Sequence, residues 1–311
     1  MGVRKMNFST MEYFLTLAQE RNFTKAAEHL HIAQQSLSSH IAGLEKELGC
    51  QLFVRRNPLT LTYAGEVMLR YATAFQKEHT AMQKEFCDIS QNQCGILRVG
   101  TSPTRARVIL PDMIRSFQIL FPNIHVEVNE APNSLLFQSL QDGELDLVIA
   151  VFPESLPDVV QRDFYREEVV LLIEKDLFCS TYGSDADSVE RQFHEGCFRE
   201  LGRCPFVLGG VEDIDGKIGR AALNRAGIKK PTIKVTSHSM GPLLALCLRG
   251  VGAYFCPENL ARASLTEEQL ASLMLFKLGE EAQYPVRFGY QMQSYQWSVI
   301  QTFMSCAETM L

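Results

Sequence analysis

Residues 22–65 read NFTKAAEHLHIAQQSLSSHIAGLEKELGCQLFVRRNPLTLTYAG. Apolar residues recur in this stretch at helical spacing, and they predict a helix over 24–30, a break, and a longer helix over 34–48. Ala26 and Ala27 are small enough to let the two helices cross closely. The stretch therefore predicts a helix-turn-helix over residues 23–42.

The segments on either side complete a small domain. An apolar stripe over 9–21 predicts a preceding helix, with Ser9 as its N-cap and Glu12 completing a capping box. Downstream, two short extended runs flank Asn57-Pro58, which indicates a hairpin or wing. We expect residues 6–63 to form a winged helix-turn-helix.

The second helix carries side chains that suit base recognition on its early, outward part. In a helix-turn-helix this part enters the major groove, where Gln can pair with adenine and Ser reaches bases or phosphates. The alternative is that a face rich in Ser and Gln is simply solvated. The predicted DNA-contacting residues are Thr24 before this helix, Gln34, Gln35, Ser36, Ser38, Ser39 and His40 on it, and Arg55 and Arg56 on the wing.

A long helix is predicted over 63–90, because no helix breaker follows Gly65. Its apolar residues form one stripe at three- and four-residue spacing: Met68, Tyr71, Phe75, Met82, Phe86 and Ile89. A stripe on an otherwise polar helix must be buried against something, and the simplest partner is a second copy of the chain. Residues 64–92 are therefore predicted to link the domains and to dimerise.

From Cys94-Gly95 onward, short apolar runs alternate with helical segments, which is typical of α/β domains with parallel strands. Strands are predicted at 96–100, 124–128, 145–151, 168–173, 205–208, 233–236, 252–255, 273–278 and 285–291. Helices are predicted at 109–120, 134–142, 216–226, 243–249 and from Ser294. We expect an α/β domain over 93–311 with two lobes, 95–163 with 268–311 and 164–267.

These motifs resemble the N-terminal signature of the LysR-type transcriptional regulators. The resemblance is carried by Asn22-Phe-Thr-Lys-Ala-Ala-Glu-His-Leu30, Gln34-x-x-Leu-Ser38, Ile41-x-x-Leu-Glu45-x-x-Leu-Gly49, Leu52-Phe-x-Arg55 and Leu61-Thr-x-Ala-Gly65. It implies an α+β multidomain fold: a winged helix-turn-helix, a linker helix, and a two-lobed α/β effector domain similar to type 2 periplasmic binding proteins. It also implies a DNA-binding transcriptional regulator whose small-molecule effector binds between the lobes.

Four positions depart from the family pattern. Ala33 stands where a capping Ser is usual, and Gln35 replaces a common Pro. Ser39 stands where many members have Arg, and Tyr63 replaces a Pro. Loss of that Arg removes a phosphate or guanine contact worth about 1–3 kcal/mol, so weaker or differently tuned DNA binding is expected.

The same resemblance implies an effector site formed by Thr101, Ser102, Phe206, Val207, Ser237, Ser239 and Met240. Thr101 and Ser102 stand between a strand and a helix, where backbone N–H groups and hydroxyls suit an anion. Ordinary helix capping is the alternative explanation for such residues. Arg105 and Arg107 suit an anionic ligand as well, although a solvated surface is the favoured interpretation.

The cysteines predict neither a disulfide framework nor a zinc site. There are nine, without CxxC pairs, so reduced and mostly buried thiols are expected. Members of the resembled family that sense peroxide use a cysteine pair in the region of Cys197 and Cys204. The spacing here is short and the flanking pattern differs, which argues against a redox role.

Composition and missing motifs narrow the function class. Residues 1–90 carry ten basic against nine acidic residues, whereas the whole chain has a net charge of −6, which suits a head that alone contacts phosphates. Without a signal peptide or a long apolar segment, we expect a cytoplasmic protein with no membrane partner rather than an exported solute-binding protein. No GxSxG, HExxH, P-loop or GxGxxG after a strand is present, so neither an enzyme, a metal site nor a cofactor beyond a small-molecule co-inducer is expected.

The expected partners follow from the same interpretation. They are double-stranded promoter or operator DNA, a second copy in a homodimer or homotetramer, the small-molecule effector, and RNA polymerase. A DNA-binding protein that works by oligomerisation alone, without an effector, is an alternative that the sequence leaves open.

Overall fold

The computed structural model describes residues 7–56, 58–89, 95–292 and 295–308. Contacts divide the chain into two compact units, Met1–Gly95 with Gln293–Ser298 and Ile96–Met292 with Val299–Leu311. Asn57, Cys94 and Ser294, which are named in the sequence predictions, lie outside the described ranges, as do residues 6, 90–93 and 309–311 at the ends of predicted segments.

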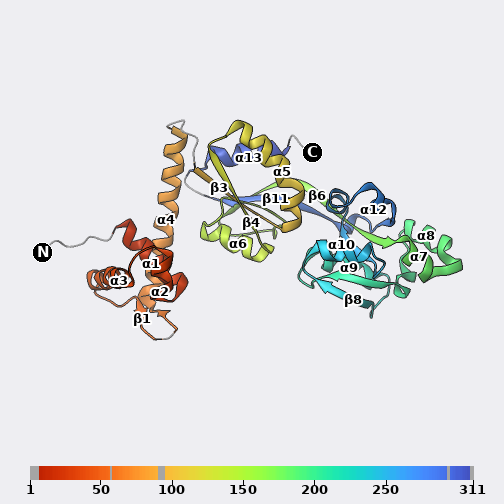
Figure 1. The fold of residues 1–311 in the computed structure, drawn as a ribbon, viewed down its shortest axis with the longest axis horizontal. Helices are drawn as coiled ribbons and strands as arrows, with labels where there is room; N and C mark the ends of the chain where they lie inside the picture. The colour runs from red at the N-terminus through yellow and green to blue at the C-terminus, as the bar shows by residue number, and fades with distance from the viewer. Residues whose placement is uncertain (1–6, 57, 90–94, 293–294, 309–311) are drawn as a thin grey trace. The chain divides into compact units, whose positions relative to one another are not determined.

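The first unit is a winged helix-turn-helix followed by a long helix (Figure 1). Its elements are α1 (Phe8–Glu20), α2 (Phe23–His29), α3 (Gln34–Leu48), β1 (Phe53–Val54), β2 (Thr60–Leu61) and α4 (Tyr63–Ile89). β1 and β2 pair antiparallel, with Phe53 opposite Leu61, and form the wing. The predicted bounds of α3 are confirmed, and Gly49 ends it at a φ of 69°.

The start of α1 differs from the prediction. Its N-cap is Asn7, whose side-chain oxygen accepts from the backbone N–H of Thr10 at 2.9 Å. The predicted capping box of Ser9 and Glu12 is therefore wrong. Asn satisfies a first-turn N–H as well as Ser does, and here it stands two residues earlier.

The core of the first unit is formed where α1, α2, α3 and the start of α4 meet. Its fully or nearly buried members include Phe14, Leu17, Ala26, Leu37, Ile41, Leu44, Phe53, Met68 and Ala72. Gly65 lies where α4 crosses the wing, and a Cβ there would stand 2.1 Å from the backbone oxygen of Leu52. Only glycine permits this close approach.

The first lobe of the second unit contains a sheet ordered β4-β3-β5-β11-β6. Its strands are β3 (Gly95–Thr101), β4 (Ile124–Glu130), β5 (Leu147–Ala150), β11 (Gln283–Gln291) and the first part of β6 (Val159–Glu174). Its helices are α5 (Pro103–Leu120), α6 (Asn133–Asp142) and α13 (Ser298–Glu308).

The second lobe is built on the other part of β6. This part pairs with β9 (Tyr254–Pro257) and β10 (Leu273–Lys277), while β7 (Pro205–Gly209) and β8 (Thr232–Ser237) form a parallel pair. The helices are α7 (Lys175–Tyr182), α8 (Ala186–His194), α9 (Ile214–Arg225), α10 (Met240–Cys247), α11 (Glu258–Ser264) and α12 (Glu267–Ala271). Three short 3₁₀ turns lie at Gly183–Asp185, Arg199–Arg203 and Glu280–Ala282.

β6 is a single strand that serves both lobes (Figure 1). Residues 159–168 pair with β11, and residues 169–174 pair with β9 and β10. The predicted lobe boundary at 163/164 falls inside this strand. The sheet is mixed rather than parallel as predicted, because all pairings of β6 are antiparallel.

Several elements of the second unit begin elsewhere than predicted or were not predicted. α5 begins at Pro103 rather than at 109, because Pro fits the first turn of a helix, and it accommodates Pro111. The sequence analysis predicted no helix at the positions of α7, α8, α11 and α12. Within the described part of the chain, no helix has the length and apolar character needed to cross a membrane.

Candidate DNA-binding surface and effector residues

The start of α3 presents polar side chains to solvent. Gln34, Gln35, Ser36 and Ser39 are exposed, and Ser38 is half-buried. The buried face of the same helix holds Leu37, Ile41 and Leu44 against α1 and α2. The polar face is thereby fixed in orientation by the core behind it.

His40 is half-buried, like Ser38. Its ring packs edge-on against Tyr13 of α1, with 5.0 Å between the ring centroids. The side chain therefore contributes to the packing between helices, and its contact with DNA stays a prediction.

α3 begins without a side-chain cap. Ala33 occupies the N-cap in an extended conformation and makes no capping hydrogen bond, as its methyl group dictates. The first backbone N–H groups of the helix are therefore available to water or to an acceptor on a bound molecule.

The wing is fastened to α3 by one carboxylate. Glu45 Oε1 accepts from the backbone N–H groups of Leu52 at 2.8 Å and Phe53 at 3.3 Å, and its Oε2 accepts from Arg55 Nη2 at 3.2 Å. The Glu45 side chain is 10% exposed and that of Arg55 is 51% exposed. Arg55 is thereby held at the edge of the wing beside exposed Arg56.

α2 adds a further cation that the sequence predictions missed. Asn22 caps this helix and accepts from the backbone N–H groups of Thr24 and Lys25. Both side chains are exposed in the first turn. The signal was present in the sequence, since a Lys next to a predicted contact residue on the same turn supplies a charge for phosphate.

α4 divides its apolar stripe between two faces. Met68 and Ala72 are buried in the core of the first unit. The rest of the predicted stripe is between 46% and 68% exposed and comprises Tyr71, Phe75, Met82, Phe86 and Ile89. We call these five residues the α4 face.

In the first lobe, the predicted effector residues lie where β3 meets α5. Thr101 is buried and its hydroxyl donates to the backbone oxygen of Ile149 at 2.7 Å, so it holds β3 to β5. Ser102 is the N-cap of α5, makes no side-chain capping bond, and accepts from Arg105 Nη1 at 3.4 Å. Arg105 is nearly buried against Glu167, which corrects the expectation of a solvated side chain.

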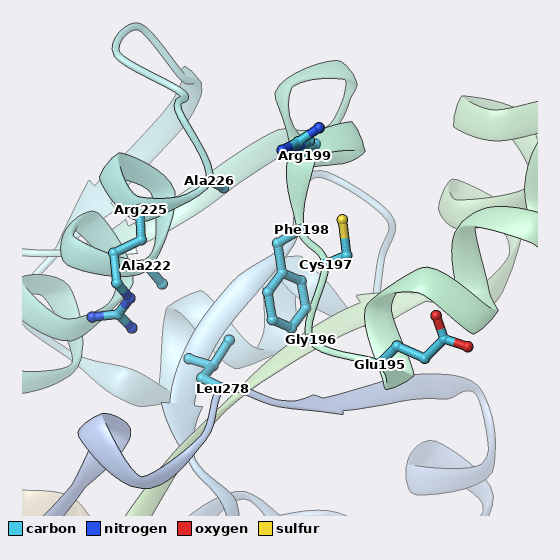
Figure 2. A pocket seen from close by; sticks show the side chains of 9 residues that line it. All are labelled: Glu195, Gly196, Cys197, Phe198, Arg199, Ala222, Arg225, Ala226 and Leu278. Carbon is cyan, nitrogen blue, oxygen red and sulfur yellow. The ribbon is translucent and has the colours of Figure 1, made fainter.

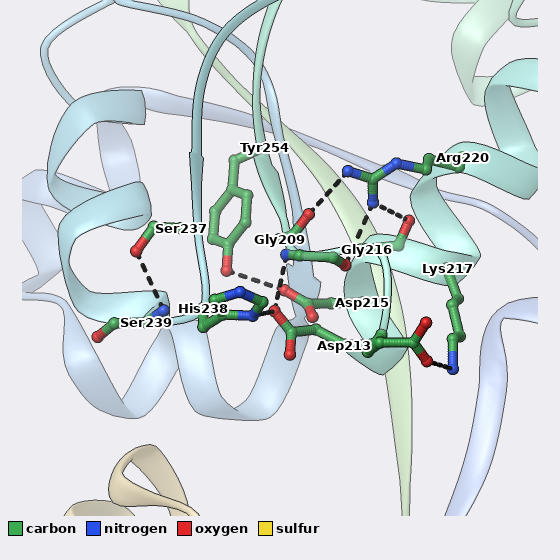
Figure 3. A network of polar contacts seen from close by, with 12 residues as sticks. Gly209, Asp213, Asp215, Gly216, Lys217, Arg220, Ser237, His238, Ser239 and Tyr254 are labelled. Atoms are coloured by element: carbon green, nitrogen blue, oxygen red, sulfur yellow. Dashed lines mark hydrogen bonds and ion pairs between the residues drawn. The ribbon is translucent and has the colours of Figure 1, made fainter. Parts of the chain in front are cut away.

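In the second lobe, Phe206 and Val207 are completely buried. The Phe206 ring stacks on Phe255, with 5.9 Å between centroids, and Val207 belongs to the apolar core. Ser237 ends β8, and its Oγ accepts from the backbone N–H of Ser239 at 3.2 Å before α10 begins at Met240 (Figure 3). The serines therefore lie at the carboxyl ends of the parallel strands, whereas the side chains of Phe206 and Val207 do not reach the surface.

A polar network next to these serines was not predicted (Figure 3). Asp213 Oδ2 accepts from the Gly210 backbone N–H at 2.7 Å and lies 3.0 Å from His238 Nδ1. Asp215 accepts from the Tyr254 hydroxyl at 3.0 Å, and burial raises the pKa of this carboxyl. A sequence pattern could not reveal the network, because the turn after β7 and the end of β8 meet only in the fold.

A pocket of about 420 Å³ lies elsewhere in the second lobe (Figure 2). It is lined by Glu195, Gly196, Cys197, Phe198, Arg199, Ala222, Arg225, Ala226 and Leu278. None of the predicted effector residues lines it. Arg225 is already paired with Glu281 at 2.6 Å, and the charged side chains drawn around the pocket do not converge on one point.

Cys197 and Cys204 differ in their surroundings. Cys197 is exposed, whereas Cys204 is buried, and burial raises the pKa of its thiol to about 12. A buried thiol that stays protonated is a poor nucleophile. The absence of a redox role for this pair stays a prediction.

Two family descriptions match the chain. Residues 8–66 match the bacterial regulatory helix-turn-helix proteins of the lysR family, and residues 90–311 match the LysR substrate binding domain. The second match alone covers more than half of the sequence.

Curated relatives are transcriptional regulators. The activator IlvY of Haemophilus influenzae is 30% identical over 274 residues, which are 88% of this chain and 90% of that protein. The uncharacterized regulator YybE of Bacillus subtilis is 33% identical over 172 residues, 55% of this chain. That alignment spans 59% of YybE, little more than half of its length.

Solved structures share the fold. A full-length OxyR variant from Pseudomonas aeruginosa superposes with a TM-score of 0.68 at 21% identity and covers 98% of this chain and 95% of its own. Full-length CbnR complexed with its target DNA has a TM-score of 0.61 at 19% identity and covers 98% of this chain and 100% of its own.

Proposed function

Because the chain belongs to the LysR family of bacterial transcriptional regulators, we propose that it binds specific promoter or operator DNA under the control of a small-molecule effector. The relatives and solved structures named above are regulators, and the chain is a regulator rather than an enzyme. A second proposal, oligomerisation without an effector, has no observation in its favour.

The observation that carries the proposal is the polar, uncapped start of α3 beside a wing held by Glu45. Recognition helices of this type read bases in the major groove with their first residues, while flanking cations contact phosphates. Bases would be contacted by Gln34, Gln35, Ser36 and Ser39, with Ser38 near the edge of that face. Phosphates would be contacted by Thr24, Lys25, Arg55 and Arg56.

The α4 face supports self-association. Five large apolar side chains at three-, four- and seven-residue spacing form a seam that a second α4 helix would cover. The helix that covers the α4 face belongs to a second copy of this chain, because a two-fold dimer also matches the two half-sites that helix-turn-helix proteins read. We propose a homodimer that pairs further into a homotetramer, acts in the cytoplasm where the chromosome lies, and contacts RNA polymerase when it activates.

The effector site is proposed between the lobes, where β3, β7 and β8 end. Ligands of α/β folds bind beyond the carboxyl ends of the parallel strands. Ser102, Ser237 and Ser239 stand at these ends, and Asp213 with His238 joins them. Thr101, Phe206, Val207 and Met240 shape the backbone that carries these groups.

The proposal is tested by fluorescence anisotropy of the full chain with labelled DNA from upstream of its own gene, at several salt concentrations. Arg55→Ala with Arg56→Ala should weaken binding and reduce the slope of log affinity against log salt by about 2, since each lost phosphate contact releases about 0.9 counterion fewer. Arg262→Ala is the matched control, because it removes an exposed, ion-paired Arg of the second unit. Affinity that is independent of salt, or equal losses in the control, would contradict DNA binding through the wing.

A further inference from the structure

Two buried charges lie directly behind Ser102. Arg105 stands in the first turn of α5 and is 7% exposed, and Glu167 on β6 is 0% exposed. Arg105 Nε and Nη2 donate to the two carboxylate oxygens at 2.9 and 2.7 Å. The remaining nitrogen, Nη1, donates to Ser102 Oγ at 3.4 Å. One guanidinium thus contacts both a proposed effector residue and the strand shared by the lobes.

Two tyrosines complete the surroundings of Glu167. Tyr284 lies directly opposite Glu167 in the register of β11 and β6, and Tyr165 lies two residues earlier on β6, so all three side chains share one face of the sheet. The tyrosine hydroxyls donate to the carboxylate at 2.7 Å from Tyr165 and 2.6 Å from Tyr284. Burial alone would raise the pKa of Glu167, but Arg105 and these donors outweigh it and hold the pKa below its ordinary value.

A buried ion pair contributes little stability beyond a well-packed apolar pair, although removing one partner is strongly destabilising. What the pair does provide is a fixed geometry, because a bidentate guanidinium tolerates little rotation. The start of α5 and the middle of β6 are therefore held as one piece.

Glu167 stands at the point where β6 changes lobes. Its neighbour Glu168 pairs with Gln283 of β11, and the next residue, Val169, already pairs with Pro257 of β9. Any displacement of Glu167 therefore reaches the first pairs of the second lobe within two residues.

A weaker contact joins the same turn of α5 to the second lobe. Arg107 Nη2 donates to Ser264 Oγ of α11 at 2.7 Å, and this contact is exposed to solvent. Water can replace it with little loss, so it opens more readily than the buried pair.

We propose that Arg105 is a positioning residue that transmits occupancy of the effector site to β6 and so to the relative position of the two lobes. A ligand acceptor group, such as a carboxylate, that accepts a hydrogen bond from the Ser102 hydroxyl or attracts Arg105 Nη1 displaces the guanidinium together with Glu167. The Arg107–Ser264 contact is the one that opens as the lobes move. This inference rests on the proposed location of the effector between the lobes.

The test measures hydrogen–deuterium exchange of the full chain, with a substitution standing in for the unidentified ligand. Ser102→Asp places a carboxylate beside Arg105, and the neutral, similarly shaped Ser102→Asn is its control. Ser102→Asp should change exchange at residues 167–173 by at least threefold, and Ser102→Asn by less than twofold. A change confined to residues 101–106 would overturn the proposal.

Two further variants separate transmission from simple stability. Tyr284→Phe removes one donor from Glu167 and keeps the ion pair, so the response of residues 167–173 to Ser102→Asp should fall by at least half. Arg107→Ala should speed exchange in α11 and leave residues 167–173 unchanged, with Arg115→Ala, which removes an exposed Arg from the same helix α5, as the control. If Tyr284→Phe instead speeds exchange equally in α10 and throughout the second unit, the pair is merely structural and the proposal fails.

DNA affinity of the same variants distinguishes the two proposals. If the wild-type chain does not bind promoter DNA, the proposed function fails whatever the exchange data show. If it binds DNA while Ser102→Asp leaves β6 unchanged, the transmission proposal alone fails.

Discussion

Glu45→Gln tests how far DNA binding depends on the placement of the wing. The Gln side chain keeps one acceptor for the Leu52 backbone N–H but offers an NH₂ group to Arg55, so the ion pair is lost. Exposed ion pairs contribute about 0–1 kcal/mol, and changing a charged acceptor to a neutral one costs about 1 kcal/mol. The wing must be held in position before it can contact DNA. A loss of about 1–2 kcal/mol in the free energy that holds it there corresponds to roughly 5- to 30-fold weaker binding.

The assay is anisotropy of the full chain with its upstream DNA, as a function of salt. Removing a negative charge near DNA would by itself strengthen binding, so a loss of affinity carries the opposite sign. The salt slope should stay unchanged for Glu45→Gln, because Arg55 still reaches a phosphate in the complex. Glu28→Gln on the exposed face of α2 is the control and should bind as tightly as wild type or tighter. Wild-type affinity for Glu45→Gln would show that DNA binding does not depend on the placement of the wing by Glu45.

Gly65→Ala should abolish tight DNA binding, because the added Cβ would stand 2.1 Å from the backbone oxygen of Leu52. Gly43→Ala, whose Cβ would have nothing within 4 Å, should instead stabilise α3 by about 0.5–1 kcal/mol. Thermal unfolding and anisotropy measure both variants. Phe75→Glu on the α4 face should convert the proposed dimer into monomers in light scattering after gel filtration, since a carboxylate in an apolar seam is left without a partner. A thiol reagent at about pH 8 should label exposed Cys197 rapidly and leave buried Cys204 unlabelled in the folded protein. Cys204 should react only on unfolding or as the pH approaches about 12, because burial raises the pKa of its thiol to about 12 and the reactive thiolate appears only there.

Each of these three predictions has a result that would contradict it. Equal behaviour of the two glycine variants would show that the wing yields to a Cβ. A Phe75→Glu chain that stays dimeric while Leu135→Glu, on α6, does not would place the dimer contact elsewhere. Rapid labelling of Cys204 in the folded protein would show that its surroundings open.

The sequence was informative where local rules and the family signature agreed. α3 and its terminal Gly49 were predicted residue for residue, because apolar spacing and a left-handed glycine both act locally. The start of α1 was misplaced, since Ser9 and Asn7 are equally good caps and only the fold decides between them. The packing of His40 on Tyr13 could not be predicted from the sequence, because Tyr13 belongs to a different helix.

Predictions failed where distant segments meet. The first half of β6 contains Asp163, Arg166 and Glu167, and such charges argue against a buried strand unless a partner is known. That partner is Arg105, 62 residues away. The burial of Arg105 could not be predicted either, because its partner Glu167 was equally unknown. The side chains of Phe206 and Val207 point into the core although the backbone around them ends at the proposed effector site. Only their strand position, not their side-chain direction, followed from the pattern.

One part of α4 is buried in the core of the first unit, and another part, the α4 face, is exposed. The number of residues between the two parts therefore sets the direction in which the α4 face points around the helix axis. Each residue of an α-helix turns the chain by about 100°, so one residue inserted between Phe75 and Met82 would swing the outer seam a quarter-turn or more around the axis. Paired recognition helices would then miss successive major grooves, although no contact residue had changed. Seven inserted residues would restore the phase to within about 20°. In the proposed dimer, the number of residues in α4 thus helps to set the spacing of the operator half-sites.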